Sequence, residues 1–255
     1  MSQFFNRSTL RASFIHFGIS LFVGVALAAA VFGFWFPHPY QHLAGGLQVF
    51  AILVGVDVVC GPLLTLVVYK ATKPRRELIV DLMVIALLQC AALGYGIHTL
   101  SLARPIALVY EVDRFRVVSI ADVQPSDAAS LPTWVSRYGF HGPRLQGLRM
   151  SLSGAELAES LDLSTQGIEP SQRPSRWQDY ALSQAQVAER AHPVAKLKAM
   201  HPARVHDIEA AIKKWQLAPD DTRWLPVVGR LADNWIVLLA PNTMAPVGFL
   251  HLSGL

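Results

Sequence analysis

Asp57 is the residue with the most unusual chemical setting, because it is the single acid in an apolar stretch that covers residues 47–68. If this stretch crosses a bilayer, Asp57 lies near the midplane, where a charged carboxylate costs about 3 kcal/mol. The carboxyl group is therefore expected to be protonated or paired. Gln89 lies at a similar depth in a second apolar stretch of opposite direction, so we predict a hydrogen bond between the two side chains. The alternative is that Asp57 contacts the helix of another protein within the bilayer.

Gly61 and Pro62 follow Asp57 by about one helical turn. Proline has no N–H to offer to the carbonyl of Val58, which predicts a kink in the helix. Glycine lets a neighbouring helix approach closely. The pair favours a kinked packing seam over a ligand site.

No arrangement typical of an active site or a metal centre occurs in the sequence. His192, His201 and His206 are nine and five positions apart, which matches neither a helical pair four apart nor a His-Glu-x-x-His pattern. A nucleophile elbow, a Walker loop and a dinucleotide fingerprint are absent as well. We therefore predict no catalytic, cofactor or metal site, and we expect a protein that is not an enzyme.

Three apolar stretches are long enough to hold these residues inside a membrane. They cover about residues 14–36, 47–68 and 78–100, and each exceeds the roughly 20 residues that cross a 30 Å hydrocarbon core as a helix. A content of 52% apolar and 16% charged residues fits a membrane anchor joined to a globular part. The predicted fold class is a membrane protein with three transmembrane α-helices, in residues 1–103, followed by a periplasmic α+β domain in residues 104–255.

A basic cluster between the second and third stretches sets the orientation. Its members are Lys70, Lys73, Arg75 and Arg76. The positive-inside rule places this cluster in the cytoplasm together with the amino terminus. The connection at residues 37–46 and everything after residue 100 then lie outside, which in a bacterium means a multi-pass inner-membrane protein with a periplasmic domain. The cluster also suits contact with membrane lipid head groups. We expect no nucleic-acid partner, because the sequence has no basic patch interleaved with aromatic residues.

The first stretch admits a second interpretation, a cleaved signal peptide. Ala26-Leu27-Ala28 has the small residues of a cleavage site. The apolar character nevertheless continues to Phe36, where a mature soluble protein would begin with polar residues. An uncleaved span is favoured.

The region after residue 104 carries strand signals near its two ends. Apolar and β-branched runs predict strands at residues 106–111, 115–120, 223–230, 235–240 and 245–252. The first two are expected to form a hairpin that leaves the membrane directly. Pro226 predicts an edge or bulged strand, because proline cannot donate to a ladder. Residues 121–149 are punctuated by proline and glycine and are expected to be loop.

Helices are expected in the middle of this region. Two capping boxes mark helix starts, and their residue pairs are Ser153 with Glu156 and Ser183 with Gln186. A polar, proline-containing linker is expected between them at residues 167–176. A further helix is predicted at residues 203–216, where apolar residues recur at the spacing typical of core packing.

Five short motifs follow one another between residues 54 and 118. They are Gly55-Val56-Asp57, Gly61-Pro62-Leu63-Leu64-Thr65-Leu66, Lys73-Pro74-Arg75-Arg76-Glu77-Leu78 with Asp81, Arg104-Pro105, and Glu111-Val112-Asp113-Arg114-Phe115. Their order and spacing resemble the TfpX/TfpZ family of type IV pilin accessory proteins. The resemblance is weaker over residues 224–248, and it is hardly visible over residues 121–220.

This resemblance implies an inner-membrane accessory or chaperone protein that supports the stability, assembly or surface display of its cognate type IV pilin. It implies no catalysis. Type IV pilins begin with an apolar helix that carries one acid near its start, so the pilin helix is the candidate partner for Asp57 and Gln89.

A second candidate contact with the pilin is a turn that is expected just above the membrane. Its residues are Glu111, Asp113, Arg114 and Phe115. The simpler interpretation is that the turn only closes a hairpin. The alternative function for the whole chain is a membrane-anchored periplasmic sensor or signalling module, whose basic loop contacts a cytoplasmic partner.

Overall fold

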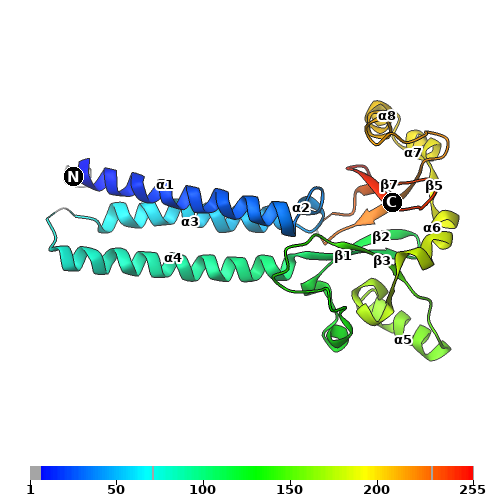
Figure 1. Cartoon of the computed structure of the whole chain (residues 1–255), viewed down its shortest axis with the longest axis horizontal. Helices are drawn as coiled ribbons and strands as arrows, with labels where there is room; N and C mark the ends of the chain where they lie inside the picture. Colours follow the sequence, from blue (N-terminus) through cyan, green and yellow to red (C-terminus); the bar gives the residue numbers. More distant parts are fainter. Residues whose placement is uncertain (1–6, 71, 231, 255) are drawn as a thin grey trace.

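The structure is a computed structural model that describes residues 7–70, 72–230 and 232–254. Within these residues, three long helices form a stalk, and a mixed domain of strands and helices lies at one end of it (Figure 1). The long helices are α1 (Arg7–Ala30), α3 (Gly46–Val68) and α4 (Arg75–Ala103). A π-helical turn, η1 (Val31–Trp35), prolongs α1, and the short helix α2 (Tyr40–Leu43) connects α1 to α3.

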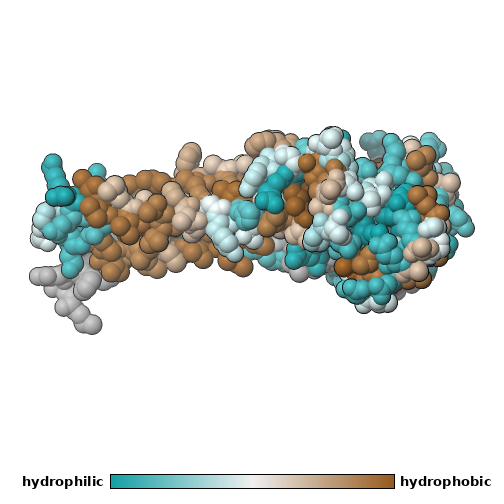
Figure 2. Space-filling view, turned by 90° about the horizontal axis from the view of Figure 1, so that it is seen from below, coloured by the Kyte–Doolittle hydropathy of each residue, from teal (hydrophilic) through white to brown (hydrophobic). Residues whose placement is uncertain are grey.

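The stalk helices are long and apolar enough to cross a membrane, over Arg7–Trp35, Gly46–Val68 and Arg75–Ala103. Figure 2 shows a hydrophobic band along the stalk and hydrophilic residues at its free end. The prediction of three apolar helices followed by an α+β domain is confirmed for the described residues. α1 and α4 begin earlier than the apolar stretches, because their first turns carry basic residues that extend beyond the apolar part.

Helix α3 lies between α1 and α4 and runs antiparallel to both (Figure 1). Glycines permit the close contact on each side of it. Gly24 of α1 faces Val54, and Gly96 of α4 faces Leu53. A side chain at either glycine would overlap its neighbour, as is typical of helix packing through small residues.

The strands of the described chain form one mixed sheet in the order β4-β3-β1-β2-β6-β7-β8, with β5 paired to β6. The strands are β1 (Pro105–Glu111), β2 (Arg114–Ser119), β3 (Arg144–Leu148), β4 (Trp177–Gln178), β5 (His192–Pro193), β6 (Arg223–Val228), β7 (Trp235–Leu239) and β8 (Pro246–Leu250). The predicted hairpin of β1 and β2 and the predicted terminal meander of β6, β7 and β8 are both confirmed. Only Arg104 separates α4 from β1, so the sheet starts where the stalk ends.

Two expectations for the sheet are wrong. Residues 121–149 are not all loop, because β3 pairs in parallel with β1. This strand contains no β-branched residue and depends on its neighbour for its conformation. Pro226 lies in β6, which is a central strand rather than an edge. It is tolerated there because β5 pairs with residues 223–224 and β2 with residues 227–228, so the proline falls between the two partners.

Helices and 3₁₀ turns flank the sheet. The α-helices are α5 (Gly154–Thr165), α6 (Gln184–Arg190), α7 (Val194–Met200) and α8 (Val205–Lys214). Helix α8 lies within the predicted range, and its Ile208 and Ile212 are buried in one cluster with Trp224 of β6. The sequence did not predict α7, a helix of 7 residues that begins directly after Pro193.

Residues 167–176, expected to be a polar, proline-containing linker, are folded rather than extended. The segment contains two 3₁₀ turns, η4 (Pro170–Gln172) and η5 (Pro174–Arg176), and η4 packs against β1 and β2. Arg173 and Arg176 are buried, and both donate to the hydroxyl oxygen of Ser160, at 3.2 and 2.7 Å. Hydrogen bonds thus compensate the burial of polar residues that sequence patterns assign to solvent.

The first predicted capping box is half formed. The amide of Glu156 donates to Oγ of Ser153 at 3.2 Å, as predicted. The carboxylate of Glu156 instead accepts a 2.6 Å hydrogen bond from the amide of Leu152 and forms a 2.8 Å ion pair with Arg149. The positive guanidinium redirects the carboxylate away from the Ser153 amide.

The second predicted capping box, Ser183 with Gln186, is not formed. A 3₁₀ turn, η6 (Tyr180–Ser183), runs directly into α6, and Ser183 makes no capping hydrogen bond there. Its Oγ accepts a 3.0 Å hydrogen bond from Gln178 of β4. The hydroxyl therefore helps to hold the edge strand rather than the helix.

The cluster around Glu156 makes the stability of the domain dependent on pH. Its hydrogen bond with Arg149, and then that with the Leu152 amide, lower the pKa of Glu156 from 4.5 to about 2. A lowered folded-state pKa means that this stabilisation is present above pH 4.5 and is lost as the pH falls through about 2. We expect Glu156→Gln to unfold at a lower temperature than the wild type at neutral pH, and the difference to vanish near pH 2. A constant difference across this pH range would contradict the assignment.

The core of the outer domain continues into the ends of the stalk helices. Phe36 and Leu43, from the connection between α1 and α3, are fully buried together with Leu100 of α4. They pack in one cluster with Phe115 and Leu225 of the sheet. The connection between α1 and α3 is therefore part of the core, and it joins stalk and domain.

Candidate functional site

A groove with a polar floor lies along the stalk between α1 and α4. It has a volume of about 510 Å³ and is open to the surface of the bundle. Its walls are mainly apolar, including Ile15 and Ile19 of α1 and Leu93 of α4. Asp57 and Gln89 also line it. We call this feature the polar groove.

A chain of hydrogen bonds crosses the polar groove and links all of its helices. Gln89 donates from Nε2 to Oδ1 of Asp57 at 3.0 Å and to the Asp57 carbonyl at 3.3 Å. This is the bond between antiparallel helices that the sequence predicts. The carboxamide oxygen of Gln89 lies 2.7 Å from Nε2 of His16, and Nδ1 of His16 lies 2.6 Å from Oγ1 of Thr65.

The direction of these bonds follows from what each group is able to donate. The oxygen of Gln89 only accepts, so Nε2 of His16 carries a hydrogen. In a neutral ring Nδ1 then accepts from the hydroxyl of Thr65. Within the described residues, Oδ1 of Asp57 accepts from Gln89 while no hydrogen bond reaches Oδ2. The groove therefore presents one carboxyl oxygen that a further group could bind.

Gly61 and Pro62 lie in the packing interface behind this chain, and both are buried. A Cβ at Gly61 would overlap the carboxamide of Gln89, so glycine leaves the space through which Gln89 reaches Asp57. The carbonyl of Pro62 accepts a 2.8 Å hydrogen bond from Ser13 of α1. The pair thus contacts both neighbouring helices.

The basic cluster lies at the free end of the stalk. Lys70, Arg75 and Arg76 are exposed there. Lys73 forms a 2.5 Å ion pair with Asp81, one and a half turns into α4. Three of the four basic side chains thus remain available to a charged surface.

The turn that the sequence places just above the membrane lies elsewhere. The 7 residues of β1 lead away from the stalk, and at about 3.3 Å per residue the turn is about 20 Å from the end of α4 (Figure 1). Glu111 and Phe115 are buried, at 5% and 0% exposure, and Phe115 belongs to the core cluster. Asp113 and Arg114 are at the surface and pair with each other at 2.8 Å, and this pairing lowers the pKa of Asp113.

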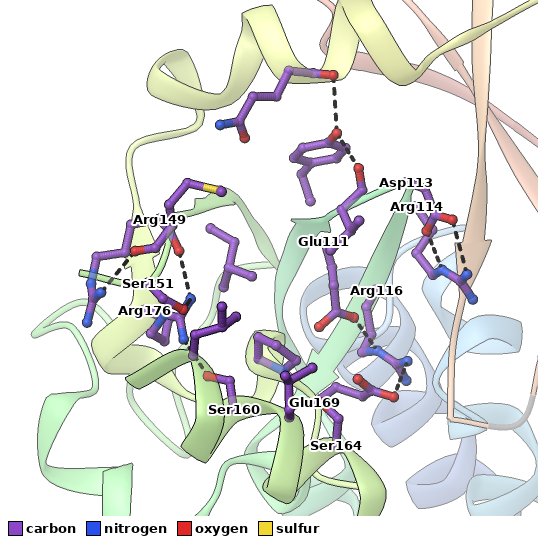
Figure 3. Close-up of a pocket in the computed structure, with 18 of the residues that line it drawn as sticks. Glu111, Asp113, Arg114, Arg116, Arg149, Ser151, Ser160, Ser164, Glu169 and Arg176 are labelled. Carbon is purple, nitrogen blue, oxygen red and sulfur yellow. Dashed lines mark hydrogen bonds and ion pairs between the residues drawn. The ribbon is translucent and has the colours of Figure 1, made fainter. Parts of the chain in front are cut away.

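A second and larger hollow lies at this end of the domain, between the β1–β2 turn, α5 and α6. Its volume is about 1100 Å³. Figure 3 shows Arg149 and Arg176 on one side of it, with Glu111 and Arg116 opposite. The leucines along its rim are exposed, and they are Leu152, Leu157 and Leu161. We call this feature the distal groove.

Sequence reasoning missed three polar members of the polar groove, namely His16, Ser20 and Thr65. Their signal is weak because a hydroxyl or an imidazole adds no charge to an apolar stretch. His16 was nevertheless detectable, since an ionisable side chain within a span usually faces the interior of a bundle and binds a polar partner.

The chain is similar over most of its length to fimbrial assembly proteins of Dichelobacter nodosus. It is 31% identical over 233 residues to "Fimbrial assembly protein, serogroup E1" and 32% identical over 234 residues to the protein of serogroup I, in each case over 91% of both chains. The protein of serogroups C1 and C2 is 41% identical over 113 residues, which are 44% of this chain and 86% of that protein.

The profile of one protein family, described as "Fimbrial assembly protein FimB", matches residues 4–45. This segment contains α1 and α2, and therefore His16 of the polar groove. No solved structure matches the chain.

Proposed function

The chain belongs to the family of fimbrial assembly proteins, and on this premise we propose that it is a non-enzymatic accessory protein, or chaperone, for a type IV pilin. The motifs that resemble the TfpX/TfpZ family support this finer assignment. We place the stalk in the bacterial inner membrane, with the basic cluster on the cytoplasmic side and the outer domain in the periplasm, in agreement with the positive-inside rule.

The observation that carries the proposal is the polar groove. One turn of an α-helix, about 10 Å wide and 5.4 Å long, occupies roughly 400 Å³, so a volume of about 510 Å³ holds the side chains of about one turn of a foreign helix. The apolar walls match a membrane-embedded helix. Oδ2 of Asp57 offers a hydrogen-bonding position to a polar group on that helix, and such a bond is worth about 1 kcal/mol in a bilayer.

The outer domain has a separate part in this proposal. A pilin whose apolar helix lies in the polar groove has its globular head on the periplasmic side, where the outer domain stands. The distal groove, with its exposed leucines and its arginines, is the surface that we assign to the head. Two contacts of this kind would keep an unassembled pilin in a fixed orientation.

Co-purification tests the intramembrane contact. We expect a full-length pilin to co-purify with this protein from detergent, and a pilin without its hydrophobic helix to be recovered in much lower yield. The contribution of the outer domain is tested separately with Leu157→Asp in the distal groove, which we expect to lower the recovery of full-length pilin. Equal recovery of the two pilins would rule out the polar groove as the binding site, and unchanged recovery with Leu157→Asp would rule out the distal groove.

A further inference from the structure

Residues 132–142, which we call the aromatic loop, expose large side chains at the junction of stalk and domain. The loop belongs to the segment that follows β2 and passes beside the end of α4 (Figure 1). Phe140 is 74% exposed and Tyr138 is 51% exposed, although aromatic side chains of this size usually bury most of their surface. Arg137, which directly precedes Tyr138 in the chain, is exposed too.

The aromatic loop is attached to the end of the first stalk helix. The ring of Phe140 packs edge-on against Phe34 with centroids 5.7 Å apart, and Tyr138 lies 6.3 Å from Trp35. The carbonyl of Gly139 accepts a 3.1 Å hydrogen bond from Nε1 of Trp35. These contacts fix the height of the loop relative to the stalk.

A second attachment comes from Arg104, the residue that joins α4 to β1. Its guanidinium is fully buried and donates from Nη1 to the same carbonyl of Gly139. The loop is therefore held at one point of its backbone by the ends of two stalk helices, while the side chains of Tyr138 and Phe140 remain exposed.

The charged residues of the stalk give the depth of the loop in a bilayer. Asp81, paired with Lys73, marks the cytoplasmic end of the apolar part of α4. About 20 residues, or 30 Å, further along the helix is the outer boundary of the hydrocarbon, near Ser101. The same count from Arg11 on α1 reaches the region of Val31. Phe34 is then about 5 Å beyond the boundary, in the head-group layer.

We propose that the aromatic loop is a lipid-binding element that inserts Phe140 and Tyr138 into the outer interface of the bilayer. The exposed surface of Phe140 is continuous with that of Phe34, which is itself 48% exposed on a membrane-spanning helix. Aromatic rings and a nearby cation, Arg137, are the residues that membrane interfaces favour. The position and the chemistry of the loop thus indicate that its binding partner is the lipid surface.

Lipid binding by the loop has a mechanical consequence. The outer domain is connected to the stalk at α4 and packs against the connection of residues 36–44. A third contact, with lipid beside the bundle, prevents the domain from tilting. The distal groove is then held away from the membrane and facing the aqueous side.

Fluorescence quenching by lipids tests this inference on the full chain. Cys60→Ala and Cys90→Ala provide a background in which Phe140→Cys carries an environment-sensitive dye, in nanodiscs that contain a single copy. Because an interfacial side chain lies about 5–10 Å below the surface, we expect lipids with a shallow nitroxide to reduce its emission about twofold or more. Tyr138→Cys in the same background should behave in the same way.

Leu152→Cys is the matched control, because Leu152 is 81% exposed but lies in the distal groove. Its dye should be unaffected by the nitroxide lipids. Equal quenching at residues 140 and 152 would overturn the inference. Blue-shifted emission at residue 140 without quenching would overturn it too, because it means that protein rather than lipid covers the loop. The test does not depend on whether the protein binds a pilin.

Discussion

Replacing Gly229 with alanine is expected to destabilise the protein by about 1–3 kcal/mol, the usual cost of overpacking a core. Gly229 follows β6, and a Cβ at this position would overlap the backbone carbonyl of Leu43 in α2. The obstacle is backbone rather than the end of a flexible side chain. Leu43 cannot move away, because it is fully buried in the same cluster as Phe36.

The measurement is thermal unfolding of the purified full chain in detergent. A loss of this size corresponds to a shift of about 2–12 °C for a chain of 150–250 residues. Gly154→Ala is the matched control, because it lies in the first turn of α5 and a Cβ there meets nothing within 4 Å. Alanine favours a helix over glycine, so this variant should be as stable as the wild type or slightly more so. Equal destabilisation by both substitutions would show that α2 does not pack against Gly229.

The parts of the fold that the sequence predicted correctly are those with local signals. Apolar length alone indicates the stalk helices, and β-branched runs on both sides of Asp113 indicate the β1–β2 hairpin. Strand β3 and the central position of Pro226 depend on partners far away in the sequence, which no local pattern reveals. The same is true of Ser171, whose amide donates to the buried carboxylate of Glu111 across 60 positions of the chain.

The candidate site was predictable in part for a similar reason. Counting depth along antiparallel helices brings Asp57 and Gln89 to the same level, and their hydrogen bond is present. The count says nothing about rotation around the helix axis, which decides whether His16 also faces inward. That rotation is set by contacts of small residues, such as Gly24 against Val54, and it emerges only from the packed bundle.

Asp57→Leu is expected to lower the recovery of co-purified pilin about tenfold, which corresponds to about 1.4 kcal/mol. Leucine keeps the bulk but removes the side-chain acceptor for Gln89 and the free carboxyl oxygen in the groove, while the backbone carbonyl at this position remains. The bundle itself should persist, because one hydrogen bond between helices contributes only about 1–2 kcal/mol. Asp57→Asn is the control that keeps an oxygen to accept from Gln89. The readouts are pilin level, piliation of cells and pilin recovered in detergent.

The two substitutions separate the roles of Asp57. If the carboxyl group of Asp57 only pairs helices, Asp57→Asn behaves like the wild type. Gly61→Ala displaces Gln89 but leaves Asp57 unchanged, so in this case it reproduces the defect of Asp57→Leu. If the acid contacts the pilin helix through its charge or its proton, Asp57→Asn loses pilin as Asp57→Leu does, while Gly61→Ala retains more of it. Normal piliation with Asp57→Leu would exclude both roles of the carboxyl group, because neither its hydrogen bond with Gln89 nor its contact with the pilin survives the substitution.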